Sequence, residues 1–194
     1  DRCLSRGLGD VYKRQANVIG KIISRNHKYR DEFVIIGAHF DHLGYGGPGS
    51  GSLKPDTNAV HNGANDNASG TAGLLELAHK LQANRKLLKR SILFIAFDAE
   101  EKGLLGSKYF VQNPTINIKN VSAMINMDMI GKMRDSTVII GGVGTSPVFE
   151  PILDSLSIDT GLKFEYDKAG YGPSDHASFY AENIPVLFLS LIHI

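Results

Sequence analysis

Short apolar runs alternate with amphipathic segments through most of the chain, and this alternation limits its fold more than any other feature. The runs at 32–40 (EFVIIGAHF) and 91–97 (SILFIAF) are almost continuously apolar, as in strands that are buried on both faces. Between them, residues 67–81 carry apolar side chains three and four positions apart, which is the spacing of a helix with one buried face. The pattern predicts an α/β fold in which helices cover a largely parallel sheet.

Weaker signals complete the expected order of elements. Further strands are predicted at 17–23, 121–127, 137–140, 163–166 and 185–188, and further helices at 104–111, 147–162 and 174–182. Residues 43–62 form a long glycine-rich loop, and loops of this length usually border a functional site. Asp66 or Asn67 is placed to cap the helix that follows. In such folds ligands bind at the carboxyl ends of the strands, so the polar residues there are the candidates for function.

Composition excludes several classes of protein and of metal site. The 21 Lys and Arg residues nearly balance the 20 Asp and Glu residues, so the charge does not indicate binding to nucleic acid. No apolar stretch of the sequence approaches the roughly 18 residues that a membrane span needs. A single Cys allows neither an internal disulfide nor a thiolate metal cluster. A bound metal would therefore be held by His and carboxylate side chains.

Both ends of the chain resemble translated sequencing adapter. Residues 10–15 (DVYKRQ) and 189–194 (LSLIHI) can be encoded by the two complementary strands of one DNA string, and that string resembles a transposase adapter used to prepare sequencing libraries. Segments of this kind are not part of a natural fold. We therefore expect residues 1–15 and 189–194 to be artefact, and 16–188 to be part of a longer natural protein.

Acids or histidines follow four of the apolar or small-residue segments. The motifs are GAHFDH at 37–42, NDNASG at 65–70, DAEE at 98–101 and NMD at 126–128. A charge in so apolar a setting is costly unless it is paired or bound to a metal. Convergence on one cation site explains the four motifs together, and one imidazole with several carboxylates suits a divalent ion such as zinc.

The spacing within two of these motifs indicates different tasks for neighbouring residues. His39 and Asp41 lie two apart at a strand end and so point to one face, where Asp41 can accept the second ring N–H of His39 and orient the ring. Glu100 and Glu101 are adjacent, so one can bind the metal while the other takes a proton from water. The alternative for this pair is an ordinary solvated acidic turn.

Five motifs in order resemble the M28 family of zinc aminopeptidases of the two-zinc type. They are GAHFDH, NGANDNASGTAG, AFDAEEKGLLGS, INMDMIG and GPSDHASF, and the resemblance covers essentially all of 16–188. It implies a three-layer α/β/α sandwich with a mostly parallel mixed sheet, here a partial catalytic domain truncated at its carboxyl end. It also implies hydrolysis of the N-terminal peptide bond of a peptide, with a water shared by two zinc ions.

The resemblance assigns metal ligands and catalytic residues by position. It makes His39 and Asp128 ligands of one zinc, Asp66 the bridging carboxylate and Glu101 a ligand of the other zinc. Glu100 becomes the general base that activates the metal-bound water, and Asp41 the partner of His39. The peptide bond after Asp66 is expected to be cis.

Substrate contacts are assigned to three residues outside the metal set. Tyr171 matches a tyrosine that helps stabilise the oxyanion, Met129 is expected to line the pocket for the first side chain, and the segment around His176 helps shape the site without binding zinc. Phe179 is a further pocket candidate, with core packing as the alternative.

The family's fifth protein ligand has no counterpart in the expected natural sequence. That ligand is a His in a segment resembling His-x-x-x-Asp after the final strand, whereas the natural sequence is expected to stop at Phe188. His193 lies in the adapter-like segment and is not expected to replace it. We therefore expect the polypeptide as written to hold at most one zinc firmly and to have little activity. His42 and His61 are interpreted as loop histidines close enough to the site to touch substrate.

Other functions stay open at this stage. The alternatives are a non-catalytic peptidase-like domain and a glutaminyl-cyclase or carboxypeptidase-like member of the same scaffold, although Asp66 and the paired glutamates favour peptide hydrolysis. The glycine run at 141–144 lacks both the third glycine of a dinucleotide fingerprint and the Gly-Lys-Ser/Thr of a P-loop, which disfavours nucleotide binding. The resemblance favours an exported protein, and the oligomeric state is not readable from the sequence.

Overall fold

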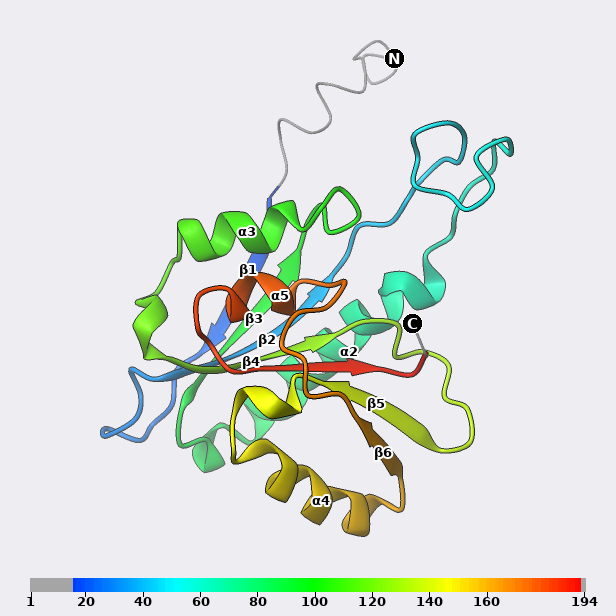
Figure 1. Cartoon of the computed structure of the whole chain (residues 1–194). Coiled ribbons are helices and arrows are strands. Elements are labelled where there is room, and N and C mark those ends of the chain that lie inside the picture. Colours follow the sequence, from blue (N-terminus) through cyan, green and yellow to red (C-terminus); the bar gives the residue numbers. More distant parts are fainter. Residues whose placement is uncertain (1–15, 193–194) are drawn as a thin grey trace.

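The computed structural model describes residues 16–192, and these residues form a seven-stranded mixed sheet covered by helices (Figure 1). The strand order is β1-β3-β2-β4-β7-β5-β6. The strands are β1 Val18–Ile22, β2 Phe33–His39, β3 Ser91–Phe97, β4 Val121–Met127, β5 Thr137–Gly141, β6 Lys163–Tyr166 and β7 Val186–Ser190. Strands β3, β2, β4 and β7 are parallel to one another, while β1 pairs antiparallel with β3 and β5 antiparallel with β7. The predicted α/β fold with a mostly parallel mixed sheet is confirmed.

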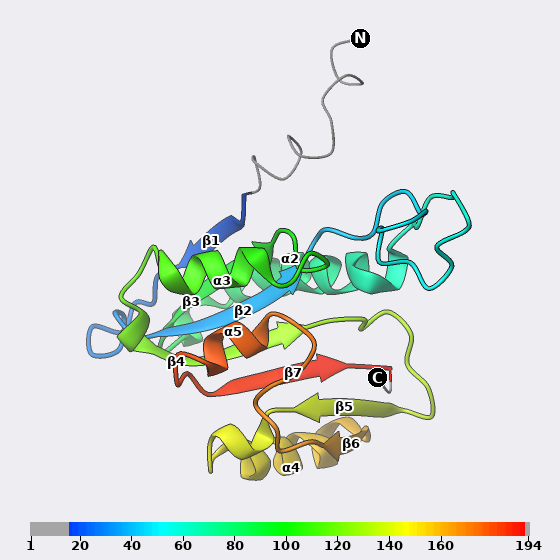
Figure 2. The same cartoon turned by 45° about the horizontal axis from the view of Figure 1, so that its top comes forward.

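Helices cover both faces of the sheet, which makes the fold a three-layer sandwich (Figure 2). The helices are α2 Gly70–Ala83, α3 Leu105–Gln112, α4 Phe149–Thr160 and α5 His176–Tyr180. Phe110 of α3 and Phe179 of α5 pack against one face of the central strands. Leu74 of α2 and Leu153 of α4 pack against the opposite face. Strands β2 and β3 are therefore buried on both sides, as their continuous apolar runs predict.

Two of the differences between observed and expected element boundaries concern the site and the last strand. The helix predicted from 67 begins as regular α2 at Gly70, because residues 64–69 form an irregular turn with non-helical dihedral angles at Asp66 and Asn67. The last strand, expected to end at Phe188, continues to Ser190, and its Leu189 is paired with both Met127 and Ile140. The artefact predicted for residues 1–15, and His193 at the other end, lie outside the described residues. Within residues 16–192, no helix combines the length and the apolar character that crossing a bilayer requires.

Candidate metal centre

The candidate site lies at the carboxyl ends of three adjacent parallel strands. His39 is the last residue of β2, Asp128 follows β4, and Glu100 and Glu101 lie in the turn after β3. Asp66 comes from the turn Ala64–Ser69 that precedes α2. Because β3, β2 and β4 are neighbours with the same direction, their following turns meet at one edge of the sheet.

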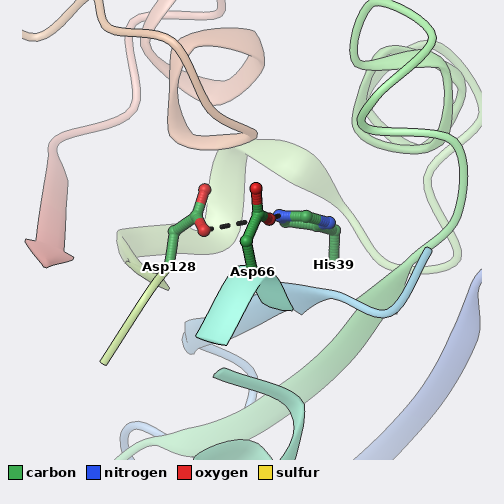
Figure 3. A group of neighbouring side chains, drawn as sticks. All are labelled: His39, Asp66 and Asp128. Carbon is green, nitrogen blue, oxygen red and sulfur yellow. Dashed lines mark ion pairs between the residues drawn. The ribbon is translucent and has the colours of Figure 1, made fainter. Parts of the chain in front are cut away.

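His39, Asp66 and Asp128 form a compact group of potential metal donors (Figure 3). The Nε2 atom of His39 lies 3.3 Å from Oδ1 of Asp66 and 3.4 Å from Oδ1 of Asp128. His39 and Asp128 are buried, and Oδ1 of Asp128 makes no hydrogen bond to any described residue. A buried carboxylate oxygen of this kind, turned toward an imidazole nitrogen, suits coordination of a cation.

Asn67 holds the two acidic members of this group in place, a role that the sequence indicated only as a possible helix cap. The side chain of Asn67 is 1% exposed. Its Nδ2 donates to the carbonyl of Met127, and its Oδ1 accepts from the main-chain N–H groups of Gly70 and Met129. These bonds join the end of β4, beside Asp128, to the start of α2, beside Asp66. The expected cis bond between Asp66 and Asn67 is present.

The second ring nitrogen of His39 faces Asp41, but its nearest acceptor is the main-chain carbonyl of Asp41 and not the carboxylate that was expected. Nδ1 of His39 lies 3.0 Å from the main-chain carbonyl oxygen of Asp41 and 3.6 Å from the carboxylate Oδ1 of Asp41. The carboxylate accepts hydrogen bonds from the main-chain N–H groups of Glu100 and Glu101 instead. Asp41 thus orients His39 through its backbone and ties the turn after β2 to the turn after β3 through its side chain.

A second group of potential donors consists of His42, Asp66 and Glu101. Nδ1 of His42 lies 2.7 Å from Oε1 of Glu101 and 3.8 Å from Oδ2 of Asp66. Asp66 therefore faces the first group with Oδ1 and the second with Oδ2, as a bridging carboxylate does. The structure brings His42 into the site, whereas the sequence interpretation left it as a loop histidine that could touch substrate.

The glycine-rich loop 43–62 forms one wall of a cavity of about 600 Å³ beside this second group. Leu43 and the exposed side chains of Leu53 and Val60 lie along this open cavity, together with the imidazole of His42 and the carboxylate of Glu101. The loop therefore borders the site, as its length predicts.

Electrostatics in the site raise the pKa values of His39 and Glu100. Burial acts to lower the pKa of His39, but the carboxylates of Asp128, Asp41 and Asp66 outweigh it and raise that pKa far above its ordinary value. Burial raises the pKa of Glu100 to about 8, opposed by the positive charge of His39 and reinforced by nearby carboxylates. A glutamate with this pKa can both accept and release a proton near neutral pH.

Asp175 is a further buried acid near the site that the sequence reasoning did not single out. Burial raises its pKa to about 7, against the effects of Ser107 and His39. Neither of its carboxylate oxygens has a hydrogen-bond partner within the described range, and its charge acts on Glu100. Its position in the motif GPSDHASF, next to His176, was the available signal.

The three predicted substrate contacts have different surroundings. Tyr171 is 65% exposed, and its ring meets that of Tyr180 edge-on at 4.7 Å. Met129 directly follows Asp128 and has a left-handed backbone with φ of 56°. His176 is 2% exposed and stacks on Phe188, and burial lowers its pKa to about 4. His176 is therefore a buried neighbour of the site in this structure, and its contact with substrate stays a prediction.

The sequence and the fold are similar to those of known peptidases. Residues 17–193 match the peptidase family M28. Leucine aminopeptidase 1 of Leptosphaeria maculans is 29% identical over 187 residues, which cover 90% of this chain and 45% of that protein. The chain spans less than half the length of the curated relatives it matches.

Solved structures show the same relationship. A zinc aminopeptidase from Bacillus subtilis superposes with a TM-score of 0.67 at 28% identity, covering 90% of this chain and 39% of that one. A glutaminyl cyclase from Porphyromonas gingivalis superposes with a TM-score of 0.65 at 23% identity, covering 89% and 62%, and this likeness concerns the fold alone. The family match extends over nearly the whole described chain and includes every motif around the metal centre. The chain therefore belongs to peptidase family M28.

Proposed function

We propose that this chain carries the catalytic centre of a zinc-dependent aminopeptidase, which removes the first residue of a peptide. The observation that carries the proposal is the position of Asp66, whose two carboxylate oxygens face two separate groups of metal donors. His39 and Asp128 would hold one zinc, Glu101 would contribute to a second, and Asp66 would bridge the two. A mixed set of imidazole and carboxylate donors without thiolate is a usual zinc environment in hydrolases.

Zinc in this site would lower the pKa of bound water and polarise the scissile carbonyl. Glu100 is then the proton carrier: it accepts a proton as the water oxygen bonds to the carbonyl carbon, and it gives that proton to the amine nitrogen as the C–N bond breaks. Its raised pKa suits both steps. Asp41 supports the reaction by holding the main chain of Glu100 and orienting His39.

The cavity beside the metal centre supports a substrate with an apolar first residue. Leu43, Leu53 and Val60 contribute apolar side chains to it. Relatives named as leucine aminopeptidases agree with this choice of side chain. Tyr171 and Met129 are proposed to contact the reacting carbonyl and the first side chain. Export remains a prediction from the sequence resemblance.

Two small substrates test the proposal directly. The zinc-loaded chain should release p-nitroaniline from leucine p-nitroanilide, and none from the same compound acetylated at its amino group. Ammonia released from a peptide that begins with Gln, without p-nitroaniline, would favour the glutaminyl-cyclase alternative. Cleavage of an acetylated peptide at its carboxyl end would favour a carboxypeptidase. Binding of zinc with none of these reactions would favour a non-catalytic domain and contradict the proposal.

A further inference from the structure

His42, Glu101 and Asp66 form a second group of potential metal donors within the described residues. The ligand atoms of the three side chains all lie within 4.8 Å of one another. All three side chains are partly enclosed, with exposed fractions of 20%, 17% and 36% respectively. The group therefore differs from an acidic cluster on an open surface. Its side chains are partly enclosed, and one of them is an imidazole that faces both carboxylates.

The surrounding backbone builds this arrangement. The carboxylate of Asp41 binds the main-chain N–H groups of Glu100 and Glu101, so the turn that carries His42 is fixed against the turn that carries Glu101. Gly63 lies against the ring of His42: a Cβ atom at Gly63 would come within 2.9 Å of Cβ and 3.0 Å of Cγ of His42. The left-handed backbone of Gly63, with φ of 64°, leads the chain from there to Asp66. His42 therefore lies against two segments, one at Gly63 and one at Glu101, that are distant from it in the sequence.

We propose that His42 is a protein ligand of the second metal ion, together with Glu101 and with Asp66 as the carboxylate shared with the His39 site. This inference rests on the proposed function, in which His39, Asp66 and Asp128 hold the first zinc. One imidazole nitrogen and two carboxylate oxygens are a common three-ligand set for catalytic zinc, which keeps a further position open for water or substrate. His42 then adds an imidazole nitrogen to the carboxylate oxygens that Glu101 and Asp66 offer, so the described residues contain donors for two zinc ions.

The competing explanation is that His42 and Glu101 form an ion pair that only fixes the start of loop 43–62. Their 2.7 Å contact fits either role. His42→Gln separates the two, because a glutamine amide can still donate a hydrogen bond to Glu101 while it is a poor zinc ligand. His61→Ala is the matched control, because its ring lines the same cavity at 6.1 Å from that of His42 and His61 belongs to neither donor group.

The test is zinc titration of the whole 194-residue chain against a chromophoric chelator, with the melting temperature recorded for each variant. Wild type and His61→Ala should bind two zinc ions. His42→Ala and His42→Gln should bind one tightly, with the second weakened more than about 100-fold, since loss of an outer partner alone costs 10- to 100-fold. His39→Ala should lose the other ion. Cobalt in place of zinc should show a visible spectrum that changes in His42→Gln and stays unchanged in His61→Ala.

The outcomes separate this inference from the proposed function. Two zinc ions of unchanged affinity in both His42 variants would overturn the inference. One zinc in wild type, lost in His39→Ala and kept in His42→Ala, would overturn it and would leave only the His39 zinc of the proposed function. A single zinc lost on either substitution would place both histidines on one ion and would also overturn it. No zinc in wild type would contradict the proposed function itself.

Discussion

Two buried carboxyl groups in and beside this site hold a proton more tightly than usual. Glu100 and Asp175 both have raised pKa values, about 8 and about 7, and burial is the largest cause for each. Two non-glycine residues in the left-handed region, Ala99 and Met129, lie next to Glu100 and Asp128. Backbone of this kind costs free energy and is often found where side chains must be held for catalysis.

Glu100→Gln should abolish most of the proposed activity without removing the metal. Glutamine keeps the size of the side chain but cannot carry a proton, so kcat/KM for leucine p-nitroanilide should fall by about 10²- to 10⁴-fold. Zinc content should match that of wild type. Glu76→Gln, on the exposed surface of α2, is the control and should leave kcat/KM unchanged. Full activity in Glu100→Gln would remove Glu100 from the role of general base.

Asp175 should make the metal-free protein less stable as the pH rises. The folded state holds the proton of Asp175 up to about pH 7, whereas the unfolded chain releases it near the ordinary value of 3.8. Between these values the folded state binds more protons, so the free energy of unfolding falls with increasing pH. Each pKa unit corresponds to about 1.4 kcal/mol, so the loss amounts to a few kcal/mol. Asp175→Asn should remove this contribution to the pH dependence of the free energy of unfolding.

Urea unfolding of wild type and Asp175→Asn at pH 5 and pH 8.5, both with chelator, measures the effect. The variant should gain stability relative to wild type on going from the lower to the higher pH. A difference between the two proteins that is the same at both pH values would contradict the raised pKa of Asp175.

At the scale of elements, the site depends on how the start of α2 is attached to the end of β4. Asn67 makes three hydrogen bonds across this junction while fully enclosed. Asn67→Ala should lower the free energy of unfolding by about 2–4 kcal/mol, because it leaves buried main-chain groups unpaired. Chemical denaturation of the metal-free protein gives this value. Asn84→Ala, which removes an exposed side-chain bond to the carbonyl of Lys80, should cost under about 1 kcal/mol.

The order of the elements could be predicted from the sequence because the central strands are buried on both faces. The runs at 91–97 and 121–127 match β3 and β4 residue for residue. The start of α2 could not be predicted, because the hydrogen bonds of Asn67 to Met127 and Met129 join segments some 60 residues apart. For the same reason the sequence placed His39 and Asp128 in the site but left His42 in a loop. Its contact with Glu101 depends on two turns that meet only in the folded sheet.

Across the whole molecule, the helical layers are held together through a sheet that leaves little free space beneath the site. Gly37 in β2 faces the core formed with α3 and α5, two residues before His39. A Cβ atom at Gly37 would lie 2.5 Å from Cε2 of Phe97 and 2.9 Å from Cε of Met124. Phe97 and Met124 are themselves fully buried, so neither can move without displacing its own neighbours. The packing of the central strands therefore determines the position of their carboxyl ends.

Gly37→Ala tests this packing with the smallest possible change. The added methyl group should lower the free energy of unfolding by about 1–3 kcal/mol, because the core must shift to admit it. Gly20→Ala in the edge strand β1 is the matched control: no atom lies within 4 Å of the added Cβ, so its effect should be neutral or stabilising by up to about 1 kcal/mol. Urea unfolding of the metal-free proteins isolates packing from metal binding, and the Gly37 variant should show a lower midpoint at an unchanged slope. Equal midpoints for the two variants would show that the core beneath His39 accommodates a methyl group, and the metal ligands would then owe their positions to the turns rather than to the sheet.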